Sequence, residues 1–129
     1  MTSSESDILN LVIRARQDFE SGRVFDDECD LLERLYTEYT HVPEVQKFLR
    51  SAKASFPRGN CGLTSVYFRH KFATGELIQG SYNGQNHTLF QLHPKSIILD
   101  ITADQFGGSS IYLGHIIPPW SLKGVIDVE

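Results

Sequence analysis

The hydrophobic pattern of the chain changes near residue 56, and this change constrains the fold more than any other feature. Before it, apolar residues recur at steps of three and four, which is typical of amphipathic helices. Beyond residue 75, extended apolar stretches alternate with turn-forming residues. A run of helices followed by a run of strands predicts an α+β fold in which the helices pack on an antiparallel sheet.

Three helices are expected before residue 56, and their boundaries follow from capping and helix-breaking residues. Ser6 or Asp7 can cap the first helix, and Gly22 ends it. Asp26 or Asp27 opens the second. The third begins with Pro43 and closes before Pro57, because the residue that precedes a proline avoids helical angles. The inward positions are Ile8, Leu11, Val12, Ala15 and Phe19, then Cys29, Leu32, Leu35, Tyr36 and Tyr39, then Val45, Phe48, Leu49 and Ala52.

One more helix is predicted over 61–72, with Asn60 as its N-cap, and strands follow it. The expected strands lie near 76–82, 87–92, 96–102, 110–116 and 124–128, with turns at 83–84, 93–95 and 107–108. The 129 residues fit one domain, in which 1–55 form a helical part and 56–129 form a central helix and a sheet.

Charge, cysteine content and the N-terminus exclude several classes of protein. A net charge of −4 argues against a general nucleic-acid binder. Two cysteines in 129 residues do not make a disulfide scaffold, so we expect reduced thiols and a cytoplasmic protein. Residues 1–7 do not resemble a signal peptide, and no apolar run has the length of a membrane span. Metal-ligand spacings and a phosphate-binding glycine loop are also missing, so no metal or cofactor is expected.

Cys61 is the candidate nucleophile of the chain, because it stands at the predicted start of a helix. Free N–H groups and the helix dipole stabilise a thiolate there, and the amide of Cys61 itself can stabilise an oxyanion. Gly59 and Gly62 are expected to leave room for a substrate, and Asn60 is either a cap or a further oxyanion donor. The alternative is that Cys61 is a small buried residue, which is the usual role of a free cysteine. Cys29 lies on an apolar stripe, and we assign it that role.

His87 and Asp100 are the candidate partners of Cys61. If a hairpin pairs Leu92 with residue 97 or 95, then His87 and Asp100 share one face of the sheet in either register. The carboxylate can then hold one nitrogen of the imidazole and leave the other for the thiol. A loop with an odd number of residues or a bulge would break this relation. The alternatives are an exposed strand histidine and an aspartate in a turn, and His115 is the best substitute base.

The segment Phe56-Pro57-Arg58-Gly59-Asn60-Cys61-Gly62 resembles the approach to the nucleophile in the papain-like and transglutaminase-like superfamily. A strand that opens with His87, a turn and a strand that bears Asp100 are similar to the second signature of that superfamily. Together these segments cover about residues 56–106. They depart from the pattern at Leu89, where many transglutaminase-like members have an aromatic residue, and in the absence of a glutamine between Arg50 and Asn60.

The resemblance implies a helix that carries Cys61 and packs on an antiparallel sheet, and an acyl-transfer activity on a protein or peptide substrate. Cys61, His87 and Asp100 would be catalytic, and Asn60, Gly62, Gln85 and Asn86 would line the oxyanion or substrate site. Hydrolysis of an amide or peptide bond is favoured over transfer to an amine. Two alternatives remain. One is a binding module that uses the 83–86 loop and the Trp120 region. The other is a toxin-like nuclease whose phosphate contacts are Arg58, Arg69, His70 and Lys71.

Overall fold

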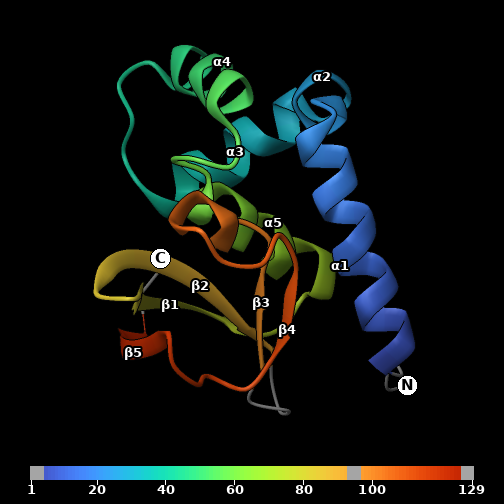
Figure 1. The fold of residues 1–129 in the computed structure, drawn as a ribbon. Coiled ribbons are helices and arrows are strands. Elements are labelled where there is room, and N and C mark those ends of the chain that lie inside the picture. The colour runs from blue at the N-terminus through green and yellow to red at the C-terminus, as the bar shows by residue number, and fades with distance from the viewer. Residues whose placement is uncertain (1–4, 93–96, 126–129) are drawn as a thin grey trace.

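The computed structural model describes residues 5–92 and 97–125, in which the chain forms five α-helices, one 3-10 helix and five strands. The helices are α1 (Glu5–Glu20), α2 (Arg23–Asp27), α3 (Cys29–Tyr39), α4 (Val45–Ser55) and α5 (Cys61–Phe72), and the 3-10 helix η1 is Ala103–Phe106. The strands are β1 (Glu76–Tyr82), β2 (Gln85–Leu92), β3 (Ile97–Asp100), β4 (Tyr112–Gly114) and β5 (Trp120–Val125). The fold is α+β with a curled antiparallel sheet, as the sequence predicts (Figure 1).

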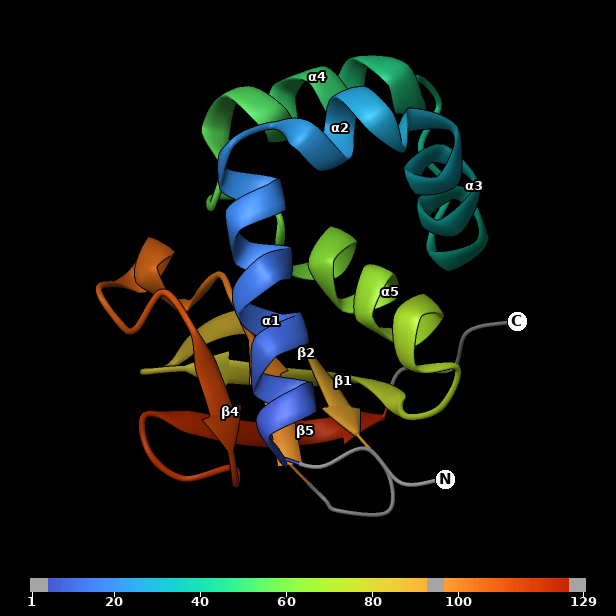
Figure 2. The ribbon, with the colours of Figure 1, turned by 90° about the vertical axis from the view of Figure 1, so that its right-hand side faces the viewer.

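Helix α5 lies between two layers of the molecule. Helices α2, α3 and α4 cover one side of it, and the sheet covers the other (Figures 1 and 2). Helix α1 runs alongside both layers (Figure 2). Because both sides of α5 are covered, every residue from Gly62 to Phe68 is buried. A helix that is buried all round has no polar face in its first two turns, and this explains why α5 lacks an amphipathic pattern there.

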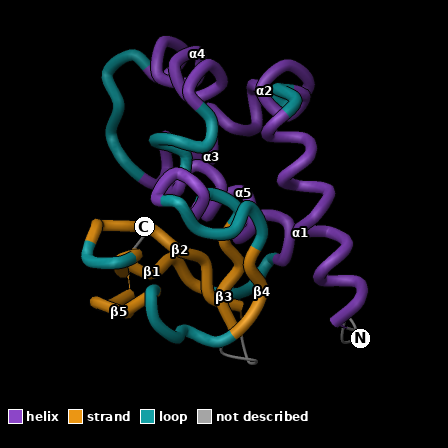
Figure 3. The backbone as a smooth tube through the Cα atoms, viewed as in Figure 1, coloured by secondary structure: helices purple, strands orange, loops and turns teal. Residues whose placement is uncertain are grey.

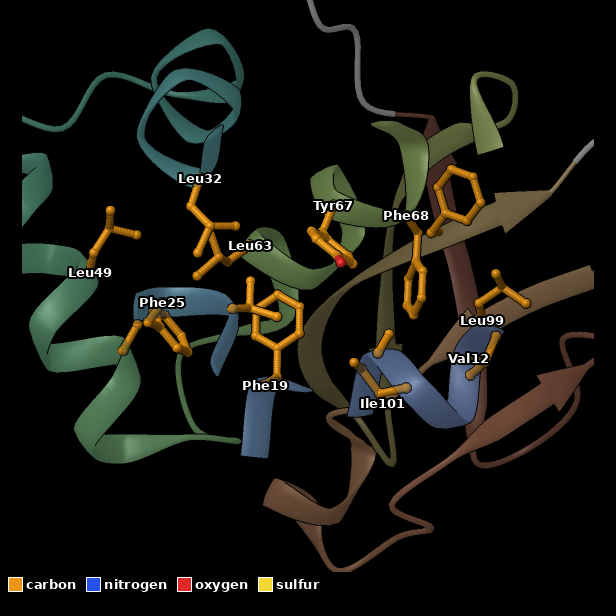
Figure 4. Packing of buried hydrophobic residues seen from close by; sticks show 14 of the residues in the cluster. Val12, Phe19, Phe25, Leu32, Leu49, Leu63, Tyr67, Phe68, Leu99 and Ile101 are labelled. Atoms are coloured by element: carbon orange, nitrogen blue, oxygen red, sulfur yellow. The ribbon is translucent and has the colours of Figure 1, made fainter. Parts of the chain in front are cut away.

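The main core joins α1, α5 and one face of the sheet. Phe19 contacts Phe25 and Tyr67 edge to face, with ring centroids 5.6 and 5.2 Å apart. Leu63 and Phe68 of α5 belong to the same cluster (Figure 4). The opposite face of the sheet has a smaller core, formed by Ile78, Leu89, Ile98, Ala103 and Trp120. Both faces of the sheet are therefore covered within the described residues.

The strands do not follow one another across the sheet in chain order. The strand order is β4-β3-β2-β1-β5, so the last strand pairs with β1 and not with its predecessor β4. The loop over 115–119 carries the chain along the sheet to this opposite edge (Figure 3). β5 begins at Trp120, earlier than the expected strand at 124–128, of which residues 126–128 lie outside the described part. Residues 93–95, an expected turn, also lie outside it.

Several helix boundaries differ from the prediction. Ser6 and Asp7 lie inside α1 and do not cap it. The second predicted helix is two helices, because Asp26 and Asp27 belong to the short α2 and α3 begins at Cys29. The expected first residue of the third helix, Pro43, precedes the first residue of α4 by two positions.

The helix ends at Gly22 and Pro57 are confirmed. Gly22 has φ 82°, a left-handed conformation that glycine adopts without strain, and it separates α1 from α2. α4 ends at Ser55, two residues before Pro57. These ends depend on backbone sterics, which act locally and can be predicted from sequence.

A buried arginine connects the N-terminal helix to the segment that follows β3. Nη1 and Nη2 of Arg16 donate to the two carboxylate oxygens of Asp104, each at 2.8 Å. Nη1 also donates to the carbonyl of Ile101 at 2.8 Å, and Nε and Nη2 donate to Glu20. Such a two-pronged arginine–carboxylate pair fixes direction as well as distance. α1 therefore determines where η1 lies.

Candidate active site

Cys61 is the first residue of α5, and the start of this helix lies beside the part of β2 that is not paired with β3. β3 pairs with β2 only from Phe90 to Leu92. On the unpaired part of β2, the carbonyl of Thr88 accepts a hydrogen bond from Ser65 of α5 at 3.4 Å, and the same hydroxyl lies 2.7 Å from the carbonyl of Cys61. The start of α5 is thus attached to the edge of β2, next to His87.

His87 and Asp100 lie together, in one of the two predicted registers. Leu92 pairs with Ile97, and this register places His87 and Asp100 diagonally on the same face of the sheet. Nε2 of His87 lies 2.8 Å from Oδ2 of Asp100, and both side chains are almost completely buried. Because the carboxylate only accepts, Nε2 carries the proton in this hydrogen bond. Nδ1 of His87 is buried and has no hydrogen-bond partner of normal geometry among the described residues.

The free nitrogen and the thiol interact, and their interaction shifts both groups towards ionisation. Burial alone would raise the pKa of Cys61, but hydrogen bonds from His87 and from the amide and hydroxyl of Thr88 outweigh it and lower that pKa. Burial likewise opposes the charged form of His87, yet hydrogen bonds with Asp100 and Cys61 raise its pKa to about 9. The arrangement therefore favours a thiolate beside an imidazolium.

The carboxylate of Asp100 accepts four hydrogen bonds. Besides His87, its Oδ2 accepts the indole N–H of Trp120 at 2.8 Å. Its Oδ1 accepts the backbone N–H of Thr102 at 2.9 Å and the hydroxyl of the same residue at 3.3 Å. Burial favours the neutral carboxyl, but the hydrogen bond from His87, followed by those from Thr102 and Trp120, lowers the pKa of Asp100 overall. The carboxylate is thus held as an anion in an apolar setting.

Aromatic side chains lie close to both His87 and Cys61. Phe106 of η1 meets the ring of His87 edge to face, with centroids 5.1 Å apart. On the side of the helices, burial raises the pKa of Tyr36 to about 12, and the nearby Tyr39 and Cys61 add to this shift. Sequence reasoning did not identify these residues, nor Thr88, Thr102 and Trp120, as parts of the site, because they come from separate elements. A single tryptophan after two prolines is the one visible signal, and the sequence alone connects it with the contact surface of the alternative binding module.

Two of the proposed oxyanion or substrate residues have other roles. Asn60 occupies the N-cap position but makes no capping hydrogen bond with its side chain. It is fully buried, and its Nδ2 donates to the carbonyls of Ala52 and Arg58 at 3.0 and 2.9 Å. Its side chain is therefore not an oxyanion donor. The prediction that Gly62 leaves room for substrate is also wrong, because a Cβ there would lie 3.1 Å from the ring of Tyr39. Close packing of α3 on α5 explains this glycine.

Gln85 and Asn86 remain available to a ligand. Both are exposed at the start of β2, beside the Asn83–Gly84 turn and within two residues of His87. The carbonyl oxygen of the Asn86 side chain accepts a hydrogen bond from Lys123 at 2.5 Å. These positions are compatible with a rim of the site, and their role stays a prediction.

The other candidates lie elsewhere. His41, His70 and His115 are exposed, and His93 is outside the described residues. The basic residues of the nuclease alternative are divided, because Arg58 precedes α5 and the other three lie in its last turn, roughly 16 Å away by helix geometry. Cys29 begins α3 instead of lying mid-helix, and it is only partly buried against the main core.

No protein-family model matches this chain, and no curated protein and no solved structure matches it either.

Proposed function

We propose that the protein is a thiol-dependent acyl-transfer enzyme, built on a papain-like or transglutaminase-like core, in which Cys61, His87 and Asp100 act as a triad. The observation that carries the proposal is the buried hydrogen bond of 2.8 Å between His87 Nε2 and Asp100, which leaves Nδ1 for the thiol at the start of α5. A nucleophile, a base and a residue that orients the base are the parts that covalent acyl transfer needs. A structural histidine would use both ring nitrogens in hydrogen bonds.

The chemistry follows from the order of these groups. His87 holds the proton of Cys61 on Nδ1, and the thiolate attacks the carbonyl carbon of an amide. Collapse of the tetrahedral adduct breaks the C–N bond, the leaving amine takes the proton from Nδ1, and a thioester remains on Cys61. Water then attacks the thioester and gives a proton to His87. The acid is released, and the thiolate–imidazolium pair is restored.

The oxyanion of the tetrahedral adduct has donors in the first turn of α5. The first hydrogen bond of this helix runs from the amide of Thr64 to the carbonyl of Asn60. The amides of Cys61, Gly62 and Leu63 precede it, so the helix itself offers them no acceptor. We assign the oxyanion to the amide of Cys61, because it belongs to the nucleophile itself, and not to the side chain of Asn60.

The substrate class that we favour is a single amide of a peptide or a protein side chain. The triad is framed by aromatic residues, and Gln85 and Asn86 supply exposed amide groups at its edge. Hydrolysis would make the protein a narrow peptidase, amidase or glutamine deamidase. General digestion of unfolded proteins by the purified chain would contradict this narrow specificity.

The test is the pH dependence of alkylation of Cys61 by iodoacetamide, followed by mass spectrometry of the peptides. Cys29 in the same molecule is the internal reference. We expect Cys61 to react faster than Cys29 below pH 8, and His87→Ala to slow Cys61 at least about tenfold at pH 6.5 with Cys29 unchanged. Equal reactivity of the two thiols, or no response to His87→Ala, would leave a binding module as the better account.

A further inference from the structure

Trp120 lies within hydrogen-bond distance of the same carboxylate oxygen that His87 uses. Its Nε1 donates to Oδ2 of Asp100 at 2.8 Å, and His87 Nε2 reaches that oxygen at the same distance. Trp120 begins β5, which pairs with β1 at the far edge of the sheet. The last strand of the described chain thus reaches the candidate triad through one N–H group.

The orientation of the indole is fixed on both sides. Tyr112 of β4 stacks on it with centroids 3.9 Å apart, and Tyr82 of β1 contacts it edge to face at 5.0 Å. Only 6% of Trp120 is exposed. A buried indole usually directs its N–H to an acceptor, since an unpaired donor is costly. Here the acceptor is the charged member of the triad, and charge-assisted hydrogen bonds are the stronger kind.

We propose that Trp120 is a positioning residue of the triad, which keeps Asp100 ionised and aimed at His87 through its indole N–H. This inference rests on the proposed function. Without the N–H, the Asp100 anion loses one of its donors and is protonated at higher pH. A neutral Asp100 supports the imidazolium less well, and the thiolate of Cys61 then forms only at higher pH.

The chain contains a single tryptophan, so a tryptophan analogue supplied during expression changes this one site. Benzothienylalanine has nearly the shape of tryptophan but carries sulfur in place of the N–H. The matched control is 5-fluorotryptophan, which keeps the N–H. Both proteins and the wild type are compared by the rate of Cys61 alkylation between pH 5 and 9, and by their urea unfolding midpoints.

We expect benzothienylalanine to slow the alkylation of Cys61 about threefold at pH 6 and to move the acidic limb of the profile to higher pH. The rate near pH 9 and the profile of the 5-fluorotryptophan protein should match the wild type. Superimposable profiles of the benzothienylalanine and wild-type proteins would overturn the inference and leave Trp120 a packing residue. If Cys61 in the wild type reacts like Cys29 at every pH, the proposed function itself fails. This outcome differs from a failure of the Trp120 inference alone, in which wild-type Cys61 still reacts faster than Cys29.

The fluorine of 5-fluorotryptophan gives a second readout. Its NMR signal should shift with pH along the acidic limb of the alkylation profile, because the indole lies against Asp100. Asp100→Asn should abolish this shift. A signal that does not titrate in the same range, in a protein whose Cys61 does, would also contradict the role of Trp120.

Discussion

Two carboxylates lie four residues apart, the buried Asp100 at the end of β3 and the half-buried Asp104 in η1, and their hydrogen-bond partners differ in kind. Asp104 binds Arg16, whose guanidinium has partners for all its nitrogens. Asp100 binds His87, whose second nitrogen is left without a normal hydrogen bond. A fully satisfied pair is what a structural junction needs. A pair with one buried nitrogen that lacks a normal hydrogen bond is more costly, and the role proposed for that nitrogen towards Cys61 accounts for this cost.

The largest effect that distinguishes the two regions is expected for Arg16→Met. Removing the arginine leaves Asp104 and the carbonyl of Ile101 without their donors, and we expect the free energy of unfolding to fall by about 3 kcal/mol. Urea denaturation measures it. The matched control is Arg23→Met, which breaks the exposed pair with Asp27 and should cost at most about 0.5 kcal/mol.

Alkylation of Cys61 in folded Arg16→Met should stay within about twofold of the wild type, since the arginine touches no member of the triad. Equal losses of stability in the two arginine variants would show that the Arg16 junction is not structural. A large loss of Cys61 reactivity would show that the two regions are coupled through η1.

The next effect concerns the pH dependence of stability. The pKa of His87 is about 9 in the folded protein, so its protonation stabilises the fold fully below its ordinary value of about 6.5. That stability is lost as the pH rises through about 9. Cys61 has the opposite sign, because its lowered pKa adds stability as the pH rises towards the ordinary pKa of a thiol. In the wild type the two trends offset each other.

In Cys61→Ala, the pH dependence that is due to His87 is no longer offset by the thiol. We expect the free energy of unfolding of this variant to fall by about 1.5 kcal/mol between pH 6.5 and 8.5. Urea denaturation at several pH values measures it, with Cys61→Ala/His87→Gln as the control that should be flat. A flat Cys61→Ala protein would mean that Asp100 does not hold the imidazolium.

A smaller effect is expected for Asp100→Asn. The amide keeps an acceptor for His87 but loses the charge, and its NH₂ group meets the N–H of Thr102, which is also a donor. We expect alkylation of Cys61 to slow about fivefold at pH 6, equivalent to about 1 kcal/mol. The comparison is Asp104→Asn, which should lower stability and leave alkylation unchanged. If Asp104→Asn slows the alkylation of Cys61 and Asp100→Asn does not, then Asp100 is not the carboxylate that supports the thiol.

The smallest effect is expected for Thr88→Val, which removes one hydrogen bond to the thiolate and keeps the backbone amide that supplies another. Alkylation at pH 6 should slow about twofold, and Thr88→Ser should restore it. A Thr88→Ser protein as slow as Thr88→Val would show that packing of the methyl group is what matters.

Sequence reasoning succeeded where local rules apply. The Cys61 helix, the strand β1 and the Asn83–Gly84 turn follow from periodicity and turn-forming residues, and Asn83 and Gly84 have the positive φ angles that such a turn requires. The alternation of faces predicted that His87 and Asp100 share a face in either of two registers, and the structure has the register that pairs Leu92 with Ile97. Asn60 and Gly62 were misread because a cap and an open flank are also local patterns, whereas their actual partners lie on α4 and α3.

The sequence by itself determined the α+β class, the helix that begins at Cys61, and the shared face of His87 and Asp100, because each depends on backbone geometry within a few residues or one hairpin. Only the tertiary structure decided that β5 returns to β1, that α5 takes the edge of β2 left free by β3, and that Trp120 and Arg16 hold the two carboxylates. These contacts join residues 20 to 88 positions apart. They form because burial of apolar surface brings the elements together. This driving force has no direction, so the sequence pattern of one element does not show which other element it will pack against.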